Sequence, residues 1–535
     1  MGTELEHLEP ILLLLLMLVA ALAVLAKRLH IAYPIVMVLG GLALSLLPEV
    51  PRVSLNPNVV FLVILPPLLF SAAFHTSWRD FRDNLVSILM LAFGLVGFTI
   101  YGVASTTRVL LPGFDWKLGL VLGAVVATTD AIAATATAKR LGLPRRVTDL
   151  LEAESLVNDG SGLVALRFTL PMVVVGVTPS VAKGVGTLLY LIVAAVLIGL
   201  FIGFGIDQVQ KRIEDAPVEI TISLITPYLA YLSAEWLQCS GVLATLACGI
   251  YLGRRSSAHY SLHARIESTA FWRTLDFILN GLVFLLLGLQ LPVILSEIHG
   301  YSVGQLVRDG AVFSGIVILL RLLWVFPGAW ISGHIQHRIA RKELQNISPR
   351  SVLLVGWAGM RGVLALAAAL SLPERIHTGA PFPQRSLIIF LTFCVIFATL
   401  VLQGLSMPAL IRRLGLAGPS PARAEETAAR RQMIQAALEA LAEIRAQGTR
   451  EERALYDRLE AHYRRRLASV GQESAERERS ARKIEHQRFV AQELRDVERA
   501  VALRLRDENQ IHDEVLRRLE HELDLLDARF AESEQ

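Results

Sequence analysis

Uncharged runs of about 20 residues recur along this chain as far as Arg413, and they limit its fold more than any other feature. In an α-helix, a run of this length spans the ~30 Å hydrocarbon core of a bilayer. The chain is 53% hydrophobic and 19% charged, and its mean hydropathy of +0.50 is too high for an ordinary soluble protein. We therefore expect an all-α polytopic membrane domain over residues 1–413.

About thirteen spans are expected in this domain from length and apolar content. Loops after odd-numbered spans carry roughly eighteen Lys and Arg residues and those after even-numbered spans about six, which favours an N-terminus outside the cell membrane and a cytoplasmic C-terminus. The expected spans are residues 8–26, 31–47, 58–74, 85–111, 118–138, 151–175, 181–207, 218–237, 241–253, 272–295, 311–333, 352–370 and 386–411.

Several protein classes are disfavoured by the sequence. Glu4, Glu6 and Glu9 precede the first span and no Lys or Arg does, so this span is expected to be a retained helix rather than a signal peptide. All three cysteines lie in apolar segments, which argues against a disulfide framework. The basic residues lie mostly in short loops, where membrane topology explains them better than nucleic-acid binding. No phosphate-binding loop and no Cys/His metal cluster is evident in the sequence.

The fifth and twelfth spans resemble each other. The fifth contains "VVATTDAIAATATA" and the twelfth "LLVGWAGMRGVLALAAA", and each combines small residues with one charge near mid-span, Asp130 or Arg361. They are seven positions apart in the order of spans, as expected for equivalent helices of two inverted six-helix repeats, which transporters interrupt at the membrane centre. The alternative is that the small residues only permit tight helix packing.

The sixth span begins with "EAESLVNDGSGLVALRF", residues 152–168, which places acidic and amide side chains in an apolar helix. Ser155 and Asp159 are four residues apart and therefore share one side of the helix. A charge at mid-membrane costs at least ~2.5–3.5 kcal/mol, so each one requires a reason. Thr129, Asp130, Ser155 and Asp159 together offer hard oxygen ligands that suit a small, largely dehydrated cation.

A buried arginine supports this interpretation. Arg321 in "GIVILLRLLWVF" has apolar neighbours on both sides and requires a carboxylate partner. Glu154 is the expected partner, because that pairing leaves Asp159 free to titrate. A helix start at the membrane interface would explain Glu152, and Asn158 in part, but it does not explain Asp130 or Arg321.

Four stretches, "ATTDAIA", "EAESLVNDGSGLV", "LPPLLFSAAFHTSWRDFRDN" and "GWAGMRGVLALA", resemble the monovalent cation:proton antiporters of the NhaP and NHE kind, across residues 10–413. The resemblance implies thirteen transmembrane helices, two of them unwound where they cross, and a homodimer. One departure is Ala131, where many relatives have proline after the aspartate. The resemblance implies that Asp159 is the carboxylate that alternates between Na⁺ and H⁺. Asp130, Thr129 and Ser155 would complete the Na⁺ shell, with Asn158 and Glu154 beside it. Glu154 and Arg321 would form a supporting ion pair, and Arg361 would lie at the second helix break.

These residues lead us to expect secondary Na⁺(Li⁺)/H⁺ antiport. One carboxylate can hold a proton or a cation but not both, and Asn158 cannot titrate, so one-for-one electroneutral exchange is expected. The protein is then not an enzyme, requires no cofactor, and has monovalent cations, protons, membrane lipids and a second copy as its partners. A K⁺/H⁺ antiporter, a cation channel and a membrane sensor that uses the tail remain alternatives.

The chain becomes charged and poor in glycine after the membrane domain, so residues 414–535 are expected to form a soluble α-helical tail. The segment "PSPAR" at 419–423 is the expected linker, and helices are expected near 422–447, 450–469 and 473–530. Apolar residues at helical spacing between Leu494 and Phe530 predict packing on another helix. A cytoplasmic tail that regulates transport or stabilises the dimer is therefore expected.

Overall fold

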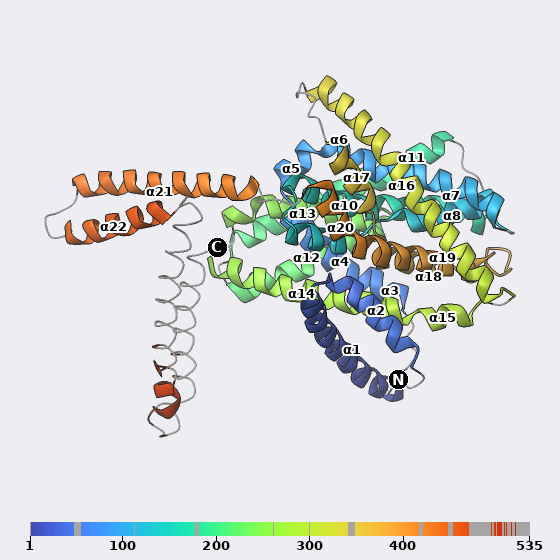
Figure 1. Ribbon diagram of the computed structural model, residues 1–535, viewed down its shortest axis with the longest axis horizontal. Helices are drawn as coiled ribbons and strands as arrows, with labels where there is room; N and C mark the ends of the chain where they lie inside the picture. Colours follow the sequence, from blue (N-terminus) through green and yellow to red (C-terminus); the bar gives the residue numbers. More distant parts are fainter. Residues whose placement is uncertain are drawn as a thin grey trace. The chain divides into compact units, whose positions relative to one another are not determined.

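The computed structural model describes residues 2–469, except 48–54, 112, 177–180, 214, 260–261, 299, 341–347, 417–420 and 448–452, together with scattered residues between 494 and 519. The chain divides into two compact units, Met1–Ser420 and Pro421–Gln535, and Figure 1 shows the elements of each. Most of the third expected tail segment, 473–530, lies outside the described residues.

All regular elements among the described residues are helices. The second unit contains α21 (Pro421–Gln447) and α22 (Arg453–Ser469). These two helices pack together, with Arg445 paired to Asp457 and Glu460. The first unit contains α1 (Gly2–Leu29), α2 (Tyr33–Ser45), α3 (Pro57–Val59), α4 (Leu65–His75), α5 (Trp78–Asp83), α6 (Leu85–Leu89), α7 (Val96–Leu110), α8 (Trp116–Ala127), α9 (Ile132–Arg140), α10 (Arg145–Val174), α11 (Val181–Gln210), α12 (Ala216–Trp236), α13 (Gly241–His259), α14 (Leu262–Leu289), α15 (Leu291–Ser296), α16 (Val303–Ala340), α17 (Pro349–Trp357), α18 (Val363–Leu370), α19 (Arg385–Ala398) and α20 (Gly404–Leu414), with the π-helical turns η1 (Val60–Ile64), η2 (Met90–Leu95) and η3 (Thr399–Gln403).

Each of the thirteen expected spans contains helical chain, although the fifth and the twelfth are interrupted. Eight helical stretches of the described residues are long and apolar enough to cross a membrane, and α2 is a shorter apolar helix. Helix α10 spans 30 residues but carries Glu152, Glu154, Asp159 and Arg167 within its length, and α17 and α18 are two short halves. The count of thirteen transmembrane helices and the inverted repeats remain predictions.

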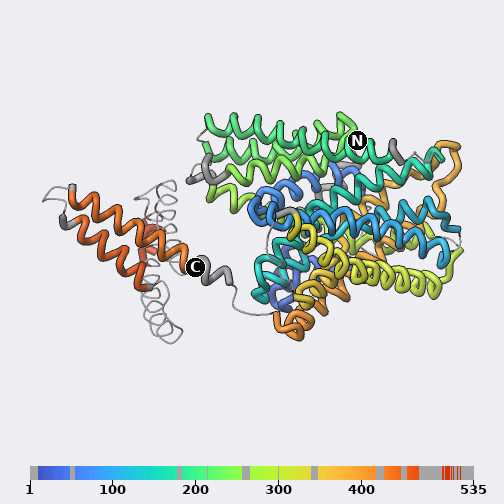
Figure 2. The backbone as a smooth tube through the Cα atoms, turned by 90° about the horizontal axis from the view of Figure 1, so that it is seen from above, coloured from blue at the N-terminus to red at the C-terminus, as the bar shows by residue number. Residues whose placement is uncertain are grey.

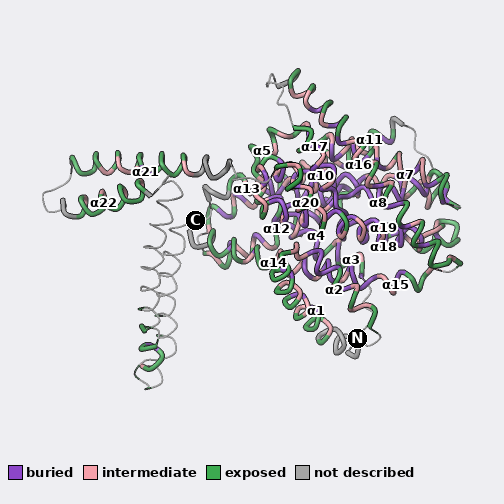
Figure 3. The backbone as a smooth tube through the Cα atoms, viewed as in Figure 1, coloured by how far each residue is buried: buried purple, intermediate pink, exposed green. Residues whose placement is uncertain are grey.

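The outer helices of the first unit expose large apolar side chains. Met17 on α1 is 71% exposed and Phe201 on α11 is 77% exposed. Figure 3 shows that buried residues gather instead around the central helices, including α8, α10 and α18. An apolar surface of this kind is stable against lipid and costly in water, so the first unit is an integral membrane domain.

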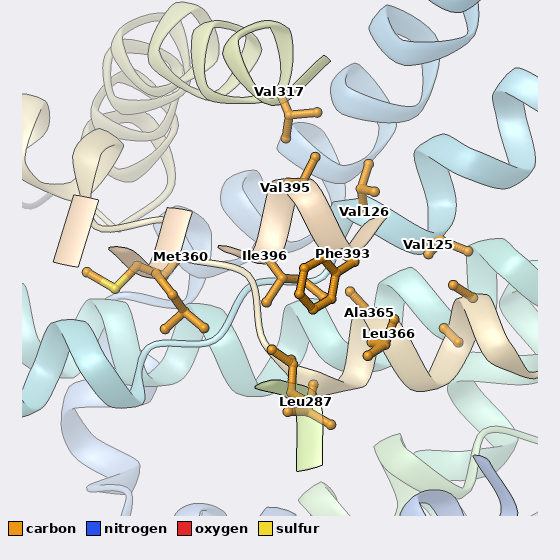
Figure 4. Close-up of a cluster of buried hydrophobic side chains, with 14 of the residues drawn as sticks. Val125, Val126, Leu287, Val317, Met360, Ala365, Leu366, Phe393, Val395 and Ile396 are labelled. Carbon is orange, nitrogen blue, oxygen red and sulfur yellow. The ribbon is translucent and has the colours of Figure 1, made fainter. Parts of the chain in front are cut away.

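The interior is built by helices that are far apart in the sequence. Helices α8, α18 and α19 contact one another, and the tube view in Figure 2 shows blue and orange segments, from opposite ends of this unit's sequence, within the same bundle. Figure 4 shows buried apolar side chains of these helices together with residues of α14, α16 and the segment between α17 and α18. The labelled residues of this cluster are Val125, Val126, Leu287, Val317, Met360, Ala365, Leu366, Phe393, Val395 and Ile396.

Two spans are interrupted inside this core. Helix α8 ends at Ala127 and α9 begins at Ile132, so residues 128–131 are not helical. Helix α17 ends at Trp357 and α18 begins at Val363. The first interruption therefore occurs with Ala131, not proline, after Asp130. Non-helical backbone at membrane depth is tolerated only where protein or a polar cavity satisfies its hydrogen bonds, so these two breaks position the site.

Close helix packing beside the core depends on glycine. At Gly288 on α14 an added Cβ would overlap the backbone carbonyl oxygen of Val38 on α2, and at Gly41 it would overlap the carbonyl oxygen of Leu285. Backbone atoms cannot rotate away, so the two helices would have to separate. By contrast, a Cβ added at Gly315 meets nothing within 4 Å.

We predict that Gly288→Ala lowers the stability of the detergent-solubilised protein by about 1–3 kcal/mol, the usual cost of overpacking. The measurement is the thermal unfolding midpoint, with Gly315→Ala as the matched control that should not lower it. Equal midpoints for the two variants would contradict the α2–α14 packing described above.

Candidate functional site

The two interrupted spans touch where their helices stop. The backbone N–H of Asp130 donates to the carbonyl oxygen of Met360 at 2.8 Å. Gly362 allows this approach, because a Cβ at that position would overlap the Asp130 side chain. The Asp130 carboxylate in turn accepts a hydrogen bond from the Ile132 N–H at 2.8 Å, at the start of α9. The crossing thus holds a carboxylate against the positive end of a half-helix.

Arg361 donates hydrogen bonds to backbone carbonyl oxygens at the end of α8 and in the second interruption. Its Nε donates to the Val126 carbonyl oxygen at 2.8 Å and its Nη1 to the Gly359 oxygen at 2.7 Å. Its backbone N–H donates to Thr399 Oγ1 in η3 at 3.0 Å. A guanidinium at the C-terminal end of a half-helix neutralises the negative end of its dipole and binds carbonyls that the interruption leaves without helical partners.

Arg321 likewise donates hydrogen bonds to backbone carbonyl oxygens at the end of α17. It donates to the carbonyl oxygens of Val355 at 3.0 Å and Gly356 at 3.1 Å. Its other donors bind both carboxylate oxygens of Glu154, at 2.6 and 2.9 Å. Gly359 is required here as well, because a Cβ there would overlap the guanidinium. Arg321 and Glu154 are each 1% exposed, so they form a fully buried bidentate ion pair.

Helix α10 holds the first interruption in place. Ser155 Oγ donates to the Thr129 carbonyl oxygen at 2.8 Å and accepts from the Ala131 N–H at 3.3 Å. The Asn158 amide donates to Thr129 Oγ1 at 2.9 Å. Because of these contacts, each freed backbone group named here has a protein partner, and the side-chain oxygens of Ser155 and Thr129 lie beside Asp130.

A cavity of about 370 Å³ reaches the crossing. Thr129, Asp130, Ser155 and Asp159 all line it, and Asp130 and Asp159 interact electrostatically. Lys139 and Glu152 also line this cavity; they form an ion pair at 2.6 Å whose side chains are 65% and 36% exposed. The cavity therefore runs from an exposed charged pair between α9 and α10 to the interrupted helices.

Asp159 differs from the other acidic residues of the crossing. Its carboxylate has no hydrogen bond or ion pair among the residues that the structure describes, whereas Glu154 is bound by Arg321 on both oxygens. Counting Asp130, Glu154 and Asp159 against Arg321 and Arg361 leaves one negative charge when all five groups are ionised. A single proton or monovalent cation in the cavity would balance that charge.

Some residues predicted from the sequence lie outside the cavity. Glu154, Asn158, Arg321 and Arg361 do not line it, and all four are buried. Asn158 retains a buried amide oxygen, and Arg361 a buried Nη2, with no hydrogen-bond partner in the described chain. These four residues hold the interrupted segments, while Thr129, Asp130, Ser155 and Asp159 face the space that an ion could occupy.

The sequence analysis missed other residues of the cavity. Ser71 and His75 on α4, and Asp276 and Asn280 on α14, line it. Asp276 lies within the apolar stretch Arg265–Ser296, so the cost of a charge in a membrane span was a signal that could have identified it. The adjacent glycines of "GMRG" could similarly have indicated close backbone approach around Arg361.

Comparisons with known proteins agree with this architecture. The profile of the family described as sodium/hydrogen exchanger, transmembrane, matches residues 13–413. An uncharacterised Na⁺/H⁺ exchanger of Mycobacterium tuberculosis is 34% identical over 526 residues, covering 96% of this chain and 95% of the relative. A sodium, potassium, lithium and rubidium/H⁺ antiporter of Bacillus subtilis is 32% identical over 393 residues, covering 71% of this chain and 58% of the relative.

One solved structure with a similar fold is that of the sodium proton antiporter MjNhaP1 from Methanocaldococcus jannaschii. Its TM-score to this chain is 0.59, with 19% sequence identity, and the match covers 78% of this chain and 100% of the other. At this identity the likeness concerns the fold.

The buried ion pair yields a prediction on stability. Glu154→Gln or Arg321→Met alone leaves an uncompensated buried charge, at a cost of about 3–5 kcal/mol. We expect each single variant to lower the thermal unfolding midpoint strongly and the double variant to recover most of the loss. The exposed Lys139–Glu152 pair is the control, since Glu152→Gln should change the midpoint little. Additive losses in the double variant would contradict direct pairing of Glu154 with Arg321.

Proposed function

Because this chain belongs to the sodium/hydrogen exchanger family, we propose that it exchanges Na⁺ or Li⁺ for H⁺ across the membrane. Members of this family are transporters and not enzymes, and they move monovalent cations and protons. The observation that carries the proposal is the placement of Asp130 and Asp159 on one cavity at the crossing of two interrupted helices. In transporters, interrupted helices provide the binding site at mid-membrane.

The cation site consists of oxygen ligands. Carboxylate oxygens of Asp130 and Asp159, and the hydroxyl oxygens of Ser155 and Thr129, are hard ligands of the kind that small cations prefer. Asp159 has no partner within the described chain to compete with the ion, so it binds either the cation or a proton. Asp130 keeps its hydrogen bond from the Ile132 N–H and contributes a carboxylate oxygen to the cation site.

Coupling follows from the single unbalanced charge. With Glu154 held by Arg321 and Asn158 unable to titrate, one cation or one proton neutralises the site in each half-cycle. No net charge then crosses the membrane in a complete cycle, so the exchange is one-for-one and electroneutral. Competition for Asp159 couples the two ions, and no separate linkage between two sites is needed.

Alternating access requires a moving element. We assign this role to the bundle that carries α8 to α10 and α17 to α18, which would move against a scaffold that dimerises with a second copy. Lys139 and Glu152 border the cavity next to the basic loop that the positive-inside rule assigns to the cytoplasm. The conformation is therefore an inward-facing one in a multi-pass inner-membrane protein, with the N-terminus outside and the tail from residue 414 in the cytoplasm, where it regulates transport or stabilises the dimer.

Potassium is a second candidate substrate. The Bacillus subtilis relative is named as a sodium, potassium, lithium and rubidium/H⁺ antiporter. The ligands around Asp159 do not by themselves select for ion size, so a K⁺/H⁺ exchanger could use the same carboxylates. Flux into proteoliposomes with Na⁺, Li⁺ and K⁺ compared at equal concentration decides which cation is exchanged.

We predict that Asp159→Asn abolishes cation-dependent proton movement in proteoliposomes, because an amide can neither titrate nor neutralise a cation. Asp309→Asn is the matched control: it alters a carboxylate that pairs with Arg308 and does not line the cavity, so it should keep wild-type exchange. Retained exchange in Asp159→Asn would remove Asp159 from the proposed role.

Stoichiometry gives an independent prediction. With the membrane potential clamped by valinomycin and K⁺ gradients, the initial rate of Na⁺/H⁺ exchange should stay the same at every potential. The measurement is proton flux by a trapped pH dye. A rate that rises or falls with voltage would refute one-for-one exchange while leaving cation/proton antiport itself intact.

A further inference from the structure

A second polar cluster lies on the cavity wall away from the interrupted helices. It consists of Ser71 and His75 on α4 and Asp276 and Asn280 on α14. None of these residues is needed to hold the breaks in α8/α9 or α17/α18. Yet Asp276 is an acidic side chain within an apolar helical stretch, and a charge in such a place is costly unless it serves a function.

The hydrogen bonds of Asp276 leave one oxygen open. Ser71 Oγ donates to Asp276 Oδ2 at 2.5 Å, while Asp276 Oδ1 is buried without a hydrogen-bond partner in the described chain. No Lys or Arg pairs with it among the described residues, and His75, which lies close enough to interact electrostatically, is turned to the backbone, with its Nδ1 2.7 Å from the Ser71 carbonyl oxygen. The hydrogen bond from Ser71 connects α4 to α14, but it involves only one of the two carboxylate oxygens of Asp276.

Asn280 adds an independent observation. It lies four residues after Asp276 and therefore on the same side of α14. It is 8% exposed, lines the cavity, and makes no hydrogen bond to any residue that the structure describes. Its amide therefore remains available to a ligand in the cavity, and its carbonyl oxygen is a hard ligand of the same kind as the carboxylate oxygens of Asp276.

We propose that Asp276 and Asn280, with the hydroxyl of Ser71, form a second station for the transported monovalent cation on the wall of the cavity that Asp159 also lines. This inference rests on the proposed function. The station supplies an unbalanced carboxylate and neutral oxygens, which suit a cation that has lost part of its water. It is not a coupling site, because exchange at Asp159 alone accounts for the stoichiometry.

The two stations share one cavity. Asp130 at the helix crossing and Asp276 on α14 both line it. A negative wall station raises the local cation concentration next to the central site. Binding there must be weak enough for the ion to leave toward Asp159, as in other multi-site pathways. The station therefore lowers the cation concentration needed for half-maximal exchange without setting the maximal rate.

The test is the cation dependence of exchange in proteoliposomes. Asp276→Asn should raise the apparent KM for Na⁺ about 3–10-fold with the maximal rate within about two-fold of wild type, the pattern expected when uniform binding is lost. Asn280→Ala, which leaves the Ser71–Asp276 bond in place, should raise KM in the same direction even if Asp276→Asn folds poorly. Asp309→Asn is the control for removal of a remote carboxylate. Unchanged KM in both cavity variants, or a fall in maximal rate at constant KM, would overturn the station.

Equilibrium binding separates this inference from the proposed function. In detergent, Asp159→Asn should still bind radioactive Na⁺ weakly, and Asp159→Asn combined with Asp276→Asn should not. Equal residual binding in the single and double variants would overturn the station. If the wild type exchanges no cation at all, the proposed function fails, while this binding comparison still decides whether Asp276 holds a cation.

Discussion

The hydrogen bond between the Asp130 N–H and the Met360 carbonyl joins two helices at the points where each is interrupted, and the site depends on that junction. An interrupted helix inside a membrane exposes backbone groups that lipid cannot satisfy. Here two arginines resolve this problem in parallel ways. Arg361 binds the carbonyl of Val126 at the end of α8, and Arg321 binds those of Val355 and Gly356 at the end of α17. The opposite half-helix, α9, begins at the carboxylate of Asp130.

Stabilising the breaks in this way determines the charge of the site. The two guanidiniums must themselves be balanced, and Glu154 balances one of them directly. Asp130 and Asp159 then share the remaining positive charge, with one negative charge left over. The same groups that make an irregular backbone tolerable in lipid therefore leave the helix crossing, Asp276 not counted, with one negative charge that one proton or one cation balances. Structure and proposed coupling have a common electrostatic origin.

The sequence predicted much of the helical chain and the residues at the crossing, and the reasons are physical. Long apolar runs mark membrane helices, and Asp130, Glu154, Asp159, Arg321 and Arg361 stand out because charges in such runs are costly. Spacing alone could not predict which of the polar residues line the cavity. Glu154 and Ser155 are adjacent on α10, yet only Ser155 lines the cavity, because tertiary packing decides the partner of each side chain.

Other features carried a weaker signal. The break after Asp130 occurs without the expected proline, because Ser155, Met360 and Arg361 satisfy the freed groups from elsewhere in the chain. Asp276, four residues before an asparagine, was not predicted to be a site residue, because it belongs to no recognisable motif. Only the cavity reveals that it shares a wall with the central site.

The central claim is that a cation and a proton compete for Asp159, and the most direct measurement is Na⁺ binding to the purified protein by calorimetry across a pH series. The Asp276→Asn background restricts the measurement to the central site. The account predicts that each bound Na⁺ displaces up to one proton, and that Na⁺ affinity falls about tenfold per pH unit at the acidic end, as linkage requires. Na⁺ binding with constant affinity and no proton release would contradict it.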